Sequence, residues 1–471
     1  MRYLTPLYDA LQQYAGQEYL RLHMPGHAGR MEMNQRYRQF AEFDVTEVPG
    51  MDDWHAPTGC IAQANQYLAD AYGAKAAVQL INGSSSGITG LFTGAFAAGD
   101  RVLIPRGAHR SFYSGLVLSG ASPVYVPVEL HENWPIPITS AEMVLRTMEQ
   151  EPQLKGIFLV NPTFYGTHME LQEIAKKAKD RNIPLFVDQA HGAHFVFHSA
   201  YPPTALEQGA SAAVFGLHKT LPVLTPGAAL GFADITWQDK VRPALSLLNT
   251  TSPSYPLMAS IDWGRAYMQE HGEELLEKAK NLSIHYQRCL SQLAGLRVLN
   301  REYKGAGDYL KVVLGLPGWK IDGYQLAEIL RKKFKIQVEM VEEQVITAMM
   351  SPFHEAADWE RLYASFAALA DRHAIRDVNW KASSDILPVP KLAMTPRQAY
   401  YAPKRTIKLQ DSRGKISGTL LVPYPPGIPL LVPGEIINNE VLERLQALLH
   451  NGHHLQGINQ AEPKMIAIID D

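Results

Sequence analysis

Residues 183–194 read Ile-Pro-Leu-Phe-Val-Asp-Gln-Ala-His-Gly-Ala-His, and residues 212–222 read Ala-Ala-Val-Phe-Gly-Leu-His-Lys-Thr-Leu-Pro. Each stretch begins with a short apolar run, which predicts a strand buried on both faces of a parallel sheet. The first run ends in Asp188, and Lys219 follows the second. Because ligands of open α/β sheets bind outside the carboxyl ends of the strands, the sequence predicts a carboxylate and an amine at one site.

A carboxylate and a lysine amine at neighbouring strand ends have a specific chemical use. The amine forms a Schiff base with an aldehyde cofactor such as pyridoxal 5'-phosphate (PLP), and a carboxylate keeps the pyridine nitrogen protonated, so that the ring accepts electrons. Taken alone, Asp188 is more often a loop cap and Lys219 a solvated surface lysine. The flanking His-Lys-Thr-Leu-Pro is too apolar for a solvated loop, which favours the cofactor site.

These two stretches resemble the ornithine/lysine/arginine decarboxylases, which are PLP enzymes of fold type I. The match is closest to the short bacterial members that lack an amino-terminal wing domain, and it extends from His23 to Glu435 with the motifs in order. The resemblance implies an α/β fold: a large domain of the PLP-dependent transferase type with a mostly parallel sheet, and a smaller α+β carboxyl-terminal domain.

Composition bounds the class of protein. The chain has 471 residues, 46% of them apolar, which is ample for a large core and predicts two or three domains. A net charge of −3 gives no reason to expect a nucleic-acid or membrane partner. Two cysteines do not form a disulfide framework. The amino terminus lacks the apolar core of a signal peptide, and no apolar run approaches the roughly 18 residues of a membrane span. We therefore expect a cytoplasmic protein.

The spacing of apolar and turn residues along the chain predicts four structural regions. Residues 1–60 form an amino-terminal arm and active-site entrance segment. Residues 61–300 form the PLP-binding large domain, in which strands and helices alternate at βαβ spacing. Residues 301–390 form a small α+β domain with a strand at 336–340, and residues 391–471 form a carboxyl-terminal segment packed with it. The proline-rich stretch 129–138 is predicted to be a loop, and 378–390 a linker.

The amino-terminal motifs allow two interpretations. His23 and His27 are four residues apart, as in some metal pairs, but Pro25-Gly26 between them excludes a regular helix. We expect no metal site here. The segment resembles the His-x-Pro-Gly-His motif near the entrance of the family's active site. Residues 44–55 resemble the family's Gly-Leu-Asp-Asp-Leu loop.

The cofactor phosphate is expected at a glycine- and serine-rich turn. Residues 82–87, Asn-Gly-Ser-Ser-Ser-Gly, lead from a predicted strand into a helix, where free backbone N–H groups and hydroxyls attract anions. Such turns also cap many ordinary helices. The resemblance implies that Ser84, Ser85 and Ser86 bind the phosphate, together with Thr251 or Ser252 of a second subunit. It thus implies an obligate homodimer with shared active sites.

The resemblance also assigns roles around the pyridine ring. Lys219 is the Schiff-base lysine and returns the proton to the substrate carbon, with assistance from His218. Asp188 holds the pyridinium proton. The small Ala190 packs beneath the ring, His191 belongs to the cofactor site, and His109 stacks on the ring, although a lone histidine after a strand is usually structural.

Three positions depart from the family pattern. Gly216 replaces a serine whose hydroxyl binds phosphate, so Gly216→Ser is expected to tighten PLP binding by about ten- to a hundredfold. Gln189 replaces a glutamate. Gly418-Thr419 replaces Ala-Glu, which removes an acid suited to a substrate cation. The remaining candidates for that acid are the following residues: Asp52, Asp53, Glu342 and Glu343.

The resemblance thus implies a PLP-dependent decarboxylase that acts on a basic amino acid, namely arginine, lysine or ornithine. One alternative is another PLP reaction on the same fold, such as that of an aminotransferase or a different lyase. The other is a catalytically weakened homologue that binds PLP without turnover.

Overall fold

The computed structural model describes residues 3–17, 19–30, 35–131, 134–303, 305–375, 389–423, 428–450, 455–459 and 463–470. Most of the predicted linker 378–390, and residues 424–427 of the proline-rich carboxyl-terminal segment, lie outside these ranges. The chain forms two compact units, each made of separate stretches of sequence. Unit 1 comprises Met1–Ala95 and Leu185–Glu277, and unit 2 comprises Phe96–Pro184 and Lys278–Asp471.

Unit 1 contains four paired strands in the order β1-β9-β8-β7. Strands β7 and β8 are parallel, and β9 is antiparallel to both β8 and β1. Every residue of these strands is buried, as the apolar runs predicted for β7 and β8. Their bounds are β1 (Ala76–Leu80), β7 (Leu185–Asp188), β8 (Ala212–Phe215) and β9 (Ala228–Phe232).

Helices cover the strands of unit 1. Helix α4 approaches α9 closely because Gly94 has no side chain: a Cβ there would lie 2.8 Å from the Cα of Val241. The helical segments are α1 (Pro6–Ala15), α2 (Gln35–Phe43), α3 (Cys60–Ala71), α4 (Gly83–Ala95), η1 (Phe195–Phe197), α8 (Leu217–Thr220), α9 (Ile235–Leu248) and α10 (Tyr255–Ser291), which ends in unit 2.

Unit 2 begins with three parallel strands in the order β6-β2-β3. Each strand is followed by a helix, which is the βαβ pattern that the sequence predicted. The strands are β2 (Arg101–Pro105), β3 (Ser122–Val126) and β6 (Leu154–Val160), and the helices are α5 (Arg110–Ser119), α6 (Ala141–Gln150) and α7 (Gln172–Asp180).

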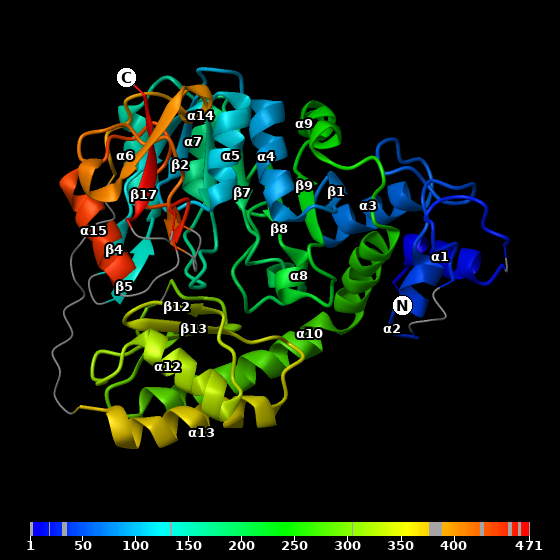
Figure 1. Cartoon of the computed structure of the whole chain (residues 1–471). Coiled ribbons are helices and arrows are strands. Elements are labelled where there is room, and N and C mark those ends of the chain that lie inside the picture. Colours follow the sequence, from blue (N-terminus) through cyan, green and yellow to red (C-terminus); the bar gives the residue numbers. More distant parts are fainter. Residues whose placement is uncertain are drawn as a thin grey trace. The chain divides into compact units, whose positions relative to one another are not determined.

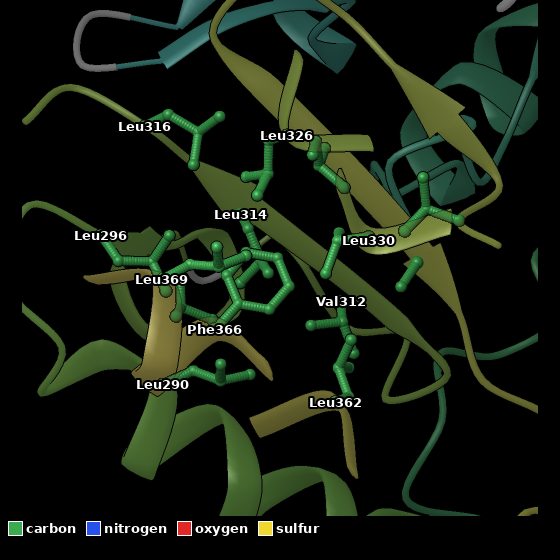
Figure 2. Close-up of a cluster of buried hydrophobic side chains, with 14 of the residues drawn as sticks. Leu290, Leu296, Val312, Leu314, Leu316, Leu326, Leu330, Leu362, Phe366 and Leu369 are labelled. Atoms are coloured by element: carbon green, nitrogen blue, oxygen red, sulfur yellow. The ribbon is translucent and has the colours of Figure 1, made fainter. Parts of the chain in front are cut away.

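A second sheet in unit 2 forms the small α+β region. Its four antiparallel strands run in the order β10-β11-β13-β12 and pack against α12 and α13 (Figure 1). Figure 2 shows the core of this region, where Val312 and Leu314 of β11 lie near Phe366 of α13. The elements are β10 (Arg297–Val298), α11 (Leu299–Glu302), β11 (Lys311–Gly315), α12 (Gly323–Ile329), η2 (Leu330–Phe334), β12 (Met340–Val341), β13 (Val345–Met349) and α13 (Ala356–His373).

The carboxyl-terminal segment has its own apolar core, which includes Leu421, Leu431 and Leu445. Two short antiparallel pairs, β14 with β17 and β15 with β16, frame it. The elements are α14 (Pro396–Tyr401), β14 (Lys404–Lys408), η3 (Leu409–Asp411), β15 (Val422–Pro423), α15 (Asn439–His450), β16 (Leu455–Gln456) and β17 (Met465–Ile469).

Two local predictions are wrong. The expected loop at 129–138 is a hairpin of β4 (Glu129–His131) and β5 (Trp134–Ile138). Prolines are tolerated there because both strands of a two-stranded hairpin are edges. Trp134 and Ile136 are buried, whereas Pro135 and Pro137, which alternate with them, are less so. The strand expected at 336–340 is confined to Met340–Val341, because the chain leaves η2 through Lys335 in a left-handed conformation.

Candidate active site

Asp188 and Lys219 lie at the ends of two neighbouring strands of unit 1. Asp188 is the last residue of β7 and pairs with Val214 of the parallel strand β8, and Lys219 lies in α8 directly after β8. The Asp188 carboxylate is buried and accepts a hydrogen bond from the Ala190 N–H at 3.0 Å. Burial raises the pKa of Asp188, and the nearby Lys219 charge opposes that rise. The sequence thus correctly predicted that these two side chains share one strand edge.

The Lys219 amine contacts a histidine. Lys219 Nζ and His191 Nε2 lie 3.0 Å apart, and His191 is 8% exposed. His191 follows Asp188 by three residues, on the turn after β7. The sequence placed His191 in the cofactor site but gave no sign of this contact, because the turn conformation that aims the ring at the amine has no distinct sequence signal.

His218, which was expected to assist Lys219, has a different principal partner. Its Nδ1 lies 2.9 Å from the Gly227 carbonyl oxygen, and its backbone N–H donates to the same oxygen at 3.0 Å. Burial lowers the pKa of His218. The ring of His218 thus ties α8 to the residue that precedes β9.

The serine turn opens α4 in the way that an anion site requires. Gly83 adopts a positive φ of 74°, and the helix begins there. Ser84 Oγ is buried and has no hydrogen-bond partner among the described residues, whereas Ser86 Oγ donates to the Gly83 carbonyl oxygen at 2.8 Å. Ser85 is exposed. A buried hydroxyl without a partner is unfavourable, so Ser84 fits a site for a phosphate or another acceptor.

Gly216 brings the parts of the site close together. A Cβ at this position would lie 2.6 Å from the Ala190 carbonyl oxygen, 3.1 Å from Lys219 Cδ and 3.1 Å from Ser84 Oγ. The Ala190 carbonyl oxygen, Lys219 Cδ and Ser84 Oγ therefore all lie close to this one position. The same distances oppose the expectation that a serine would simply add a phosphate ligand here, because its Cβ would displace the main chain at Ala190.

Gln189 is a structural residue of the turn. Its side-chain amide donates to the Gly192 carbonyl oxygen at 3.2 Å, and its Oε1 accepts from the Ala205 N–H at 2.8 Å. Gln189 is 1% exposed. An amide suits this place because it both donates and accepts, which a carboxylate does not.

Thr251 and Ser252 lie on an exposed loop of unit 1 after α9. The Ser252 N–H donates to Thr250 Oγ1 at 3.1 Å, and His55 Nε2 lies 3.0 Å from the Thr250 carbonyl oxygen. The loop is therefore held in place from the 44–55 segment.

His109 belongs to unit 2, where it caps the amino terminus of α5. Its Nδ1 accepts from the Ser111 N–H at 3.3 Å and lies 2.9 Å from Ser111 Oγ. The ring centroid of His109 is 6.5 Å from that of Phe164. Phe164 and Tyr165 line a small cavity at the carboxyl ends of β2 and β6, together with Gly107. These contacts fix the orientation of the imidazole within unit 2.

The candidate acids for a substrate cation differ in how many hydrogen-bond donors their carboxylates already have. The Asp52 carboxylate accepts from the backbone N–H groups of the following residues: Asp53, Thr58, Gly59, Ile61 and Ala62. Burial raises the pKa of Asp52, but these hydrogen bonds outweigh it and lower the pKa overall. Asp53 accepts from the His55 N–H at 2.8 Å. Both carboxylates therefore organise the loop, and of the two Asp52 has the larger number of backbone donors.

Glu342 in unit 2 is different. Its Oε1 accepts from the Tyr165 hydroxyl at 2.9 Å, and its Oε2 is buried with no partner in the described part of the chain. Burial raises the pKa of Glu342 to about 7. Glu343 is exposed, and Thr419 Oγ1 donates to the Gly457 carbonyl oxygen at 3.3 Å. Glu342 is thus the candidate acid with an unused oxygen.

The described ranges contain no candidate metal centre and no candidate membrane-spanning helix. Among these residues no group of three or more histidine, cysteine, aspartate or glutamate side chains is arranged to hold a metal ion. No helix formed by them is long and apolar enough to cross a membrane.

A lysine and a buried carboxylate at adjoining parallel strand ends, beside a serine turn that opens a helix, define the class of enzymes that use PLP. Comparison with known proteins gives the family. The model of the Orn/Lys/Arg decarboxylase major domain matches residues 5–313, and that of the carboxyl-terminal domain of the same family matches residues 381–461. The chain belongs to the Orn/Lys/Arg decarboxylase family.

Individual relatives agree with this assignment. The chain is 32% identical to an arginine decarboxylase of Bacillus subtilis over 99% of this chain and 98% of the relative. It is 30% identical to an arginine decarboxylase of Halalkalibacterium halodurans over 96% and 95%. The crystal structure of the lysine decarboxylase LdcF of Francisella novicida superposes with a TM-score of 0.85 at 19% identity, covering 99% of this chain and 81% of that one.

These comparisons confirm fold type I and identify the chain as an amino-acid decarboxylase with PLP as the cofactor that its family implies. The residues present fit that cofactor. Asp188 is a buried carboxylate at a strand end, Lys219 is an amine beside it, and Ser84 offers a hydroxyl without a partner.

Proposed function

We propose that this enzyme decarboxylates a basic amino acid and releases the corresponding amine and carbon dioxide. The observation that carries the proposal is the juxtaposition of Asp188 and Lys219 at the ends of β7 and β8. Lys219 is the lysine that binds the cofactor aldehyde. PLP, when bound, supplies the ring that accepts the electron pair left by the departing carboxylate.

Each side chain at the site has a proposed task. Asp188 holds a proton on the pyridine nitrogen, and Ala190 leaves room beneath the ring. Lys219 Nζ carries the proton that replaces the lost carboxylate on the substrate carbon. His218 keeps α8 in place through Gly227, and the family resemblance assigns His109 to the ring face. Ser84, with Ser85 and Ser86, receives the phosphate at the amino terminus of α4.

We also propose a homodimer in which Thr251 or Ser252 serves the site of the second subunit. These two residues are exposed in unit 1. Two large apolar side chains of the same unit are exposed as well: Leu247 is 79% exposed and lies just before the loop, and Leu224 is 44% exposed on a segment that places Pro226 beside Gly83. Exposed apolar side chains next to binding residues favour a surface that a second subunit covers.

Arginine is the basic substrate that the relatives favour, since both of the nearly full-length relatives named above are called arginine decarboxylases. A guanidinium needs a carboxylate partner once it leaves water. Thr419 does not provide one, and Asp52 is saturated by backbone donors. The family resemblance leaves Glu342 as a candidate for the distal cation, and its Oε2 is buried without a partner among the described residues.

The test is a decarboxylation screen of the twenty amino acids with purified protein and PLP, measured as carbon dioxide released. We expect release from arginine, lysine or ornithine, and none in Lys219→Ala. Borohydride reduction should attach the cofactor covalently to a Lys219 peptide in the native protein only.

Other outcomes decide between the alternatives. Formation of an oxo acid without carbon dioxide would identify an aminotransferase. Covalent cofactor at Lys219 with no product from any amino acid would identify a PLP-binding homologue without turnover. Release from a neutral or acidic amino acid alone would show that the substrate class is wrong, and unchanged release of carbon dioxide from arginine by Glu342→Gln would remove Glu342 from substrate binding.

A further inference from the structure

The contact between His191 and Lys219 has a consequence beyond cofactor binding. We infer that His191 is a catalytic residue that exchanges a proton with the Lys219 amine. The inference rests on the proposed function in one respect, namely that Lys219 is the lysine that reacts with PLP. It concerns only residues of unit 1, and it starts from the 3.0 Å separation between His191 Nε2 and Lys219 Nζ.

The His191 turn is rigid. Hydrogen bonds from the Gln189 side chain to Gly192 and from the Ala205 N–H to Gln189 Oε1 hold the turn from both sides. The Gly192 N–H also donates to the Gln189 carbonyl oxygen at 3.0 Å. His191 itself is 8% exposed. An imidazole held in this way stays at hydrogen-bond distance from the amine without a further loss of side-chain entropy.

Lys219 reaches His191 through the gap at Gly216. The lysine stem runs past that residue, since a Cβ on Gly216 would lie 3.1 Å from Lys219 Cδ. The family serine at this position would narrow the passage. The glycine that looks like a lost phosphate ligand in the sequence therefore allows the lysine to lie where its amine meets the imidazole.

The chemistry of the lysine requires a proton acceptor at this place. An ammonium group has no lone pair, so Lys219 must lose a proton before its nitrogen attacks the cofactor aldehyde. In the proposed step one N–H bond of Nζ breaks and one N–H bond forms at His191 Nε2, which leaves a neutral amine and an imidazolium. The imidazolium returns the same proton to Nζ when Lys219 is later required as an acid.

Two other titratable groups face the amine. The Lys219 charge favours the charged form of Asp188 and disfavours the charged form of His218. His218 is less suited to the transfer because its Nδ1 and its backbone N–H are both directed at the Gly227 carbonyl oxygen. The ring nitrogen Nε2 of His191, in contrast, lies at hydrogen-bond distance from Lys219 Nζ.

The experiment measures how fast Lys219 captures PLP. Full-length protein freed of cofactor is mixed with PLP, quenched with borohydride at set times, and analysed by mass spectrometry for the modified Lys219 peptide across a range of pH. We compare the native protein with His191→Ala and His191→Gln, and His271→Ala removes an exposed histidine of the same unit as a matched control. Exogenous imidazole is added to each.

We expect His191→Ala and His191→Gln to slow capture by about 10²-fold at neutral pH, the lower end of what a positioned acid–base group contributes. Imidazole should restore part of the rate in His191→Ala alone, and His271→Ala should match the native protein. Capture in His191→Gln at the native rate would overturn the inference, because the amide preserves a hydrogen bond but accepts no proton.

The same experiment distinguishes a wrong cofactor lysine from a wrong role for His191. If the native protein captures PLP at a lysine other than Lys219, the cofactor lysine has been chosen wrongly. If it captures PLP at Lys219 and His191→Ala does so at the native rate and pH profile, only the role of His191 is wrong. Should His191→Ala fail to fold, His191→Gln decides alone.

Discussion

Two cationic side chains of the described residues, Lys219 and Arg106, have opposite surroundings. Lys219 in unit 1 lies beside a carboxylate and an imidazole with which it can exchange a proton. Arg106 in unit 2 lies beside Glu435 in an ion pair of 3.0 Å, and both side chains are almost fully buried. A guanidinium does not lose its proton in proteins. The first cluster is suited to chemistry, and the second only to holding structure.

The hydrogen-bond partners of Arg106 show which parts of unit 2 its side chain connects. Its guanidinium donates to the Tyr113 hydroxyl and to the carbonyl oxygens of Pro429 and Leu430, at 2.8–3.0 Å. Glu435 also accepts from the Val432 N–H at 2.8 Å. Arg106 follows β2, whereas Pro429, Leu430 and Glu435 lie more than 300 residues later, so this ion pair fixes the carboxyl-terminal segment against the start of α5.

The largest expected effect is on stability, from Arg106→Met. The substitution leaves the Glu435 carboxylate buried without its partner, which costs about 3–5 kcal/mol in comparable cases. We expect a large fall in the denaturant midpoint of unfolding and little change in the borohydride-trapped fraction of Lys219 in the protein that remains folded.

The double variant Arg106→Met/Glu435→Gln separates loss of the ion pair from the unpaired charge. It should recover part of the stability, because the amide has no charge to desolvate. If Arg106→Met alone is as stable as the native protein, Arg106 contributes nothing to the stability of the fold. The structural role that distinguishes it from Lys219 would then be wrong.

The next largest effect is on turnover, from Asp188→Asn. An amide does not hold the pyridine nitrogen in its protonated form, so the ring accepts electrons less well while the cofactor still binds. We expect turnover to fall by about 10²-fold or more, the range of a positioned acid–base group, with the Kd for PLP changed by much less. Equal losses of binding and turnover would make Asp188 a structural residue.

The sequence predicted more of the first cluster than of the second. Asp188 and Lys219 were identifiable because a short apolar run before each one places it at a strand end. Arg106 and Glu435 were not, since nothing in their local sequence relates residues so distant along the chain. The apolar strands and amphipathic helices could be predicted from the periodicity of the apolar residues. The 129–138 hairpin could not, because the prolines beside Trp134 and Ile136 are more typical of a loop than of a strand.

Distances within the active site were also beyond the sequence. Comparison with the family pattern suggests that Gly216 lacks a phosphate-binding hydroxyl. The structure shows instead that a side chain at this position would have too little room. The family resemblance assigns His218 to assist Lys219, but in a short helix adjacent side chains point in different directions. The turn after β7 brought His191 to the amine instead.

A smaller effect is expected at Gly216. A Cβ there meets the Ala190 carbonyl oxygen at 2.6 Å, and overpacking of this kind costs about 1–3 kcal/mol. Gly216→Ala and Gly216→Ser should therefore both weaken PLP binding by about tenfold, measured by titration of the cofactor-free protein. Tighter binding by Gly216→Ser than by the native protein would show that the added hydroxyl outweighs the lost space, as the sequence alone suggests.

The smallest effect concerns the two carboxyls of unit 2 whose pKa burial raises to about 7, Glu342 and Glu435. Glu435 has Arg106 as its partner, whereas Glu342 has the Tyr165 hydroxyl. A raised pKa means that the folded state keeps the proton longer. The resulting stability is fully present below pH 4.5 and is lost as the pH rises through 7.

Glu342→Gln isolates the contribution of Glu342, because Glu435 is unchanged in the comparison. The variant and the native protein should unfold at similar denaturant concentrations near pH 5, and the variant should be more stable by about 1 kcal/mol at pH 8, where the native carboxylate is charged and incompletely paired. Saturating arginine should remove that difference, since the substrate cation supplies the partner that Glu342 lacks. If arginine stabilises Glu342→Gln as strongly as the native protein at pH 8, the cation binds elsewhere and Glu342 is a structural residue like Glu435.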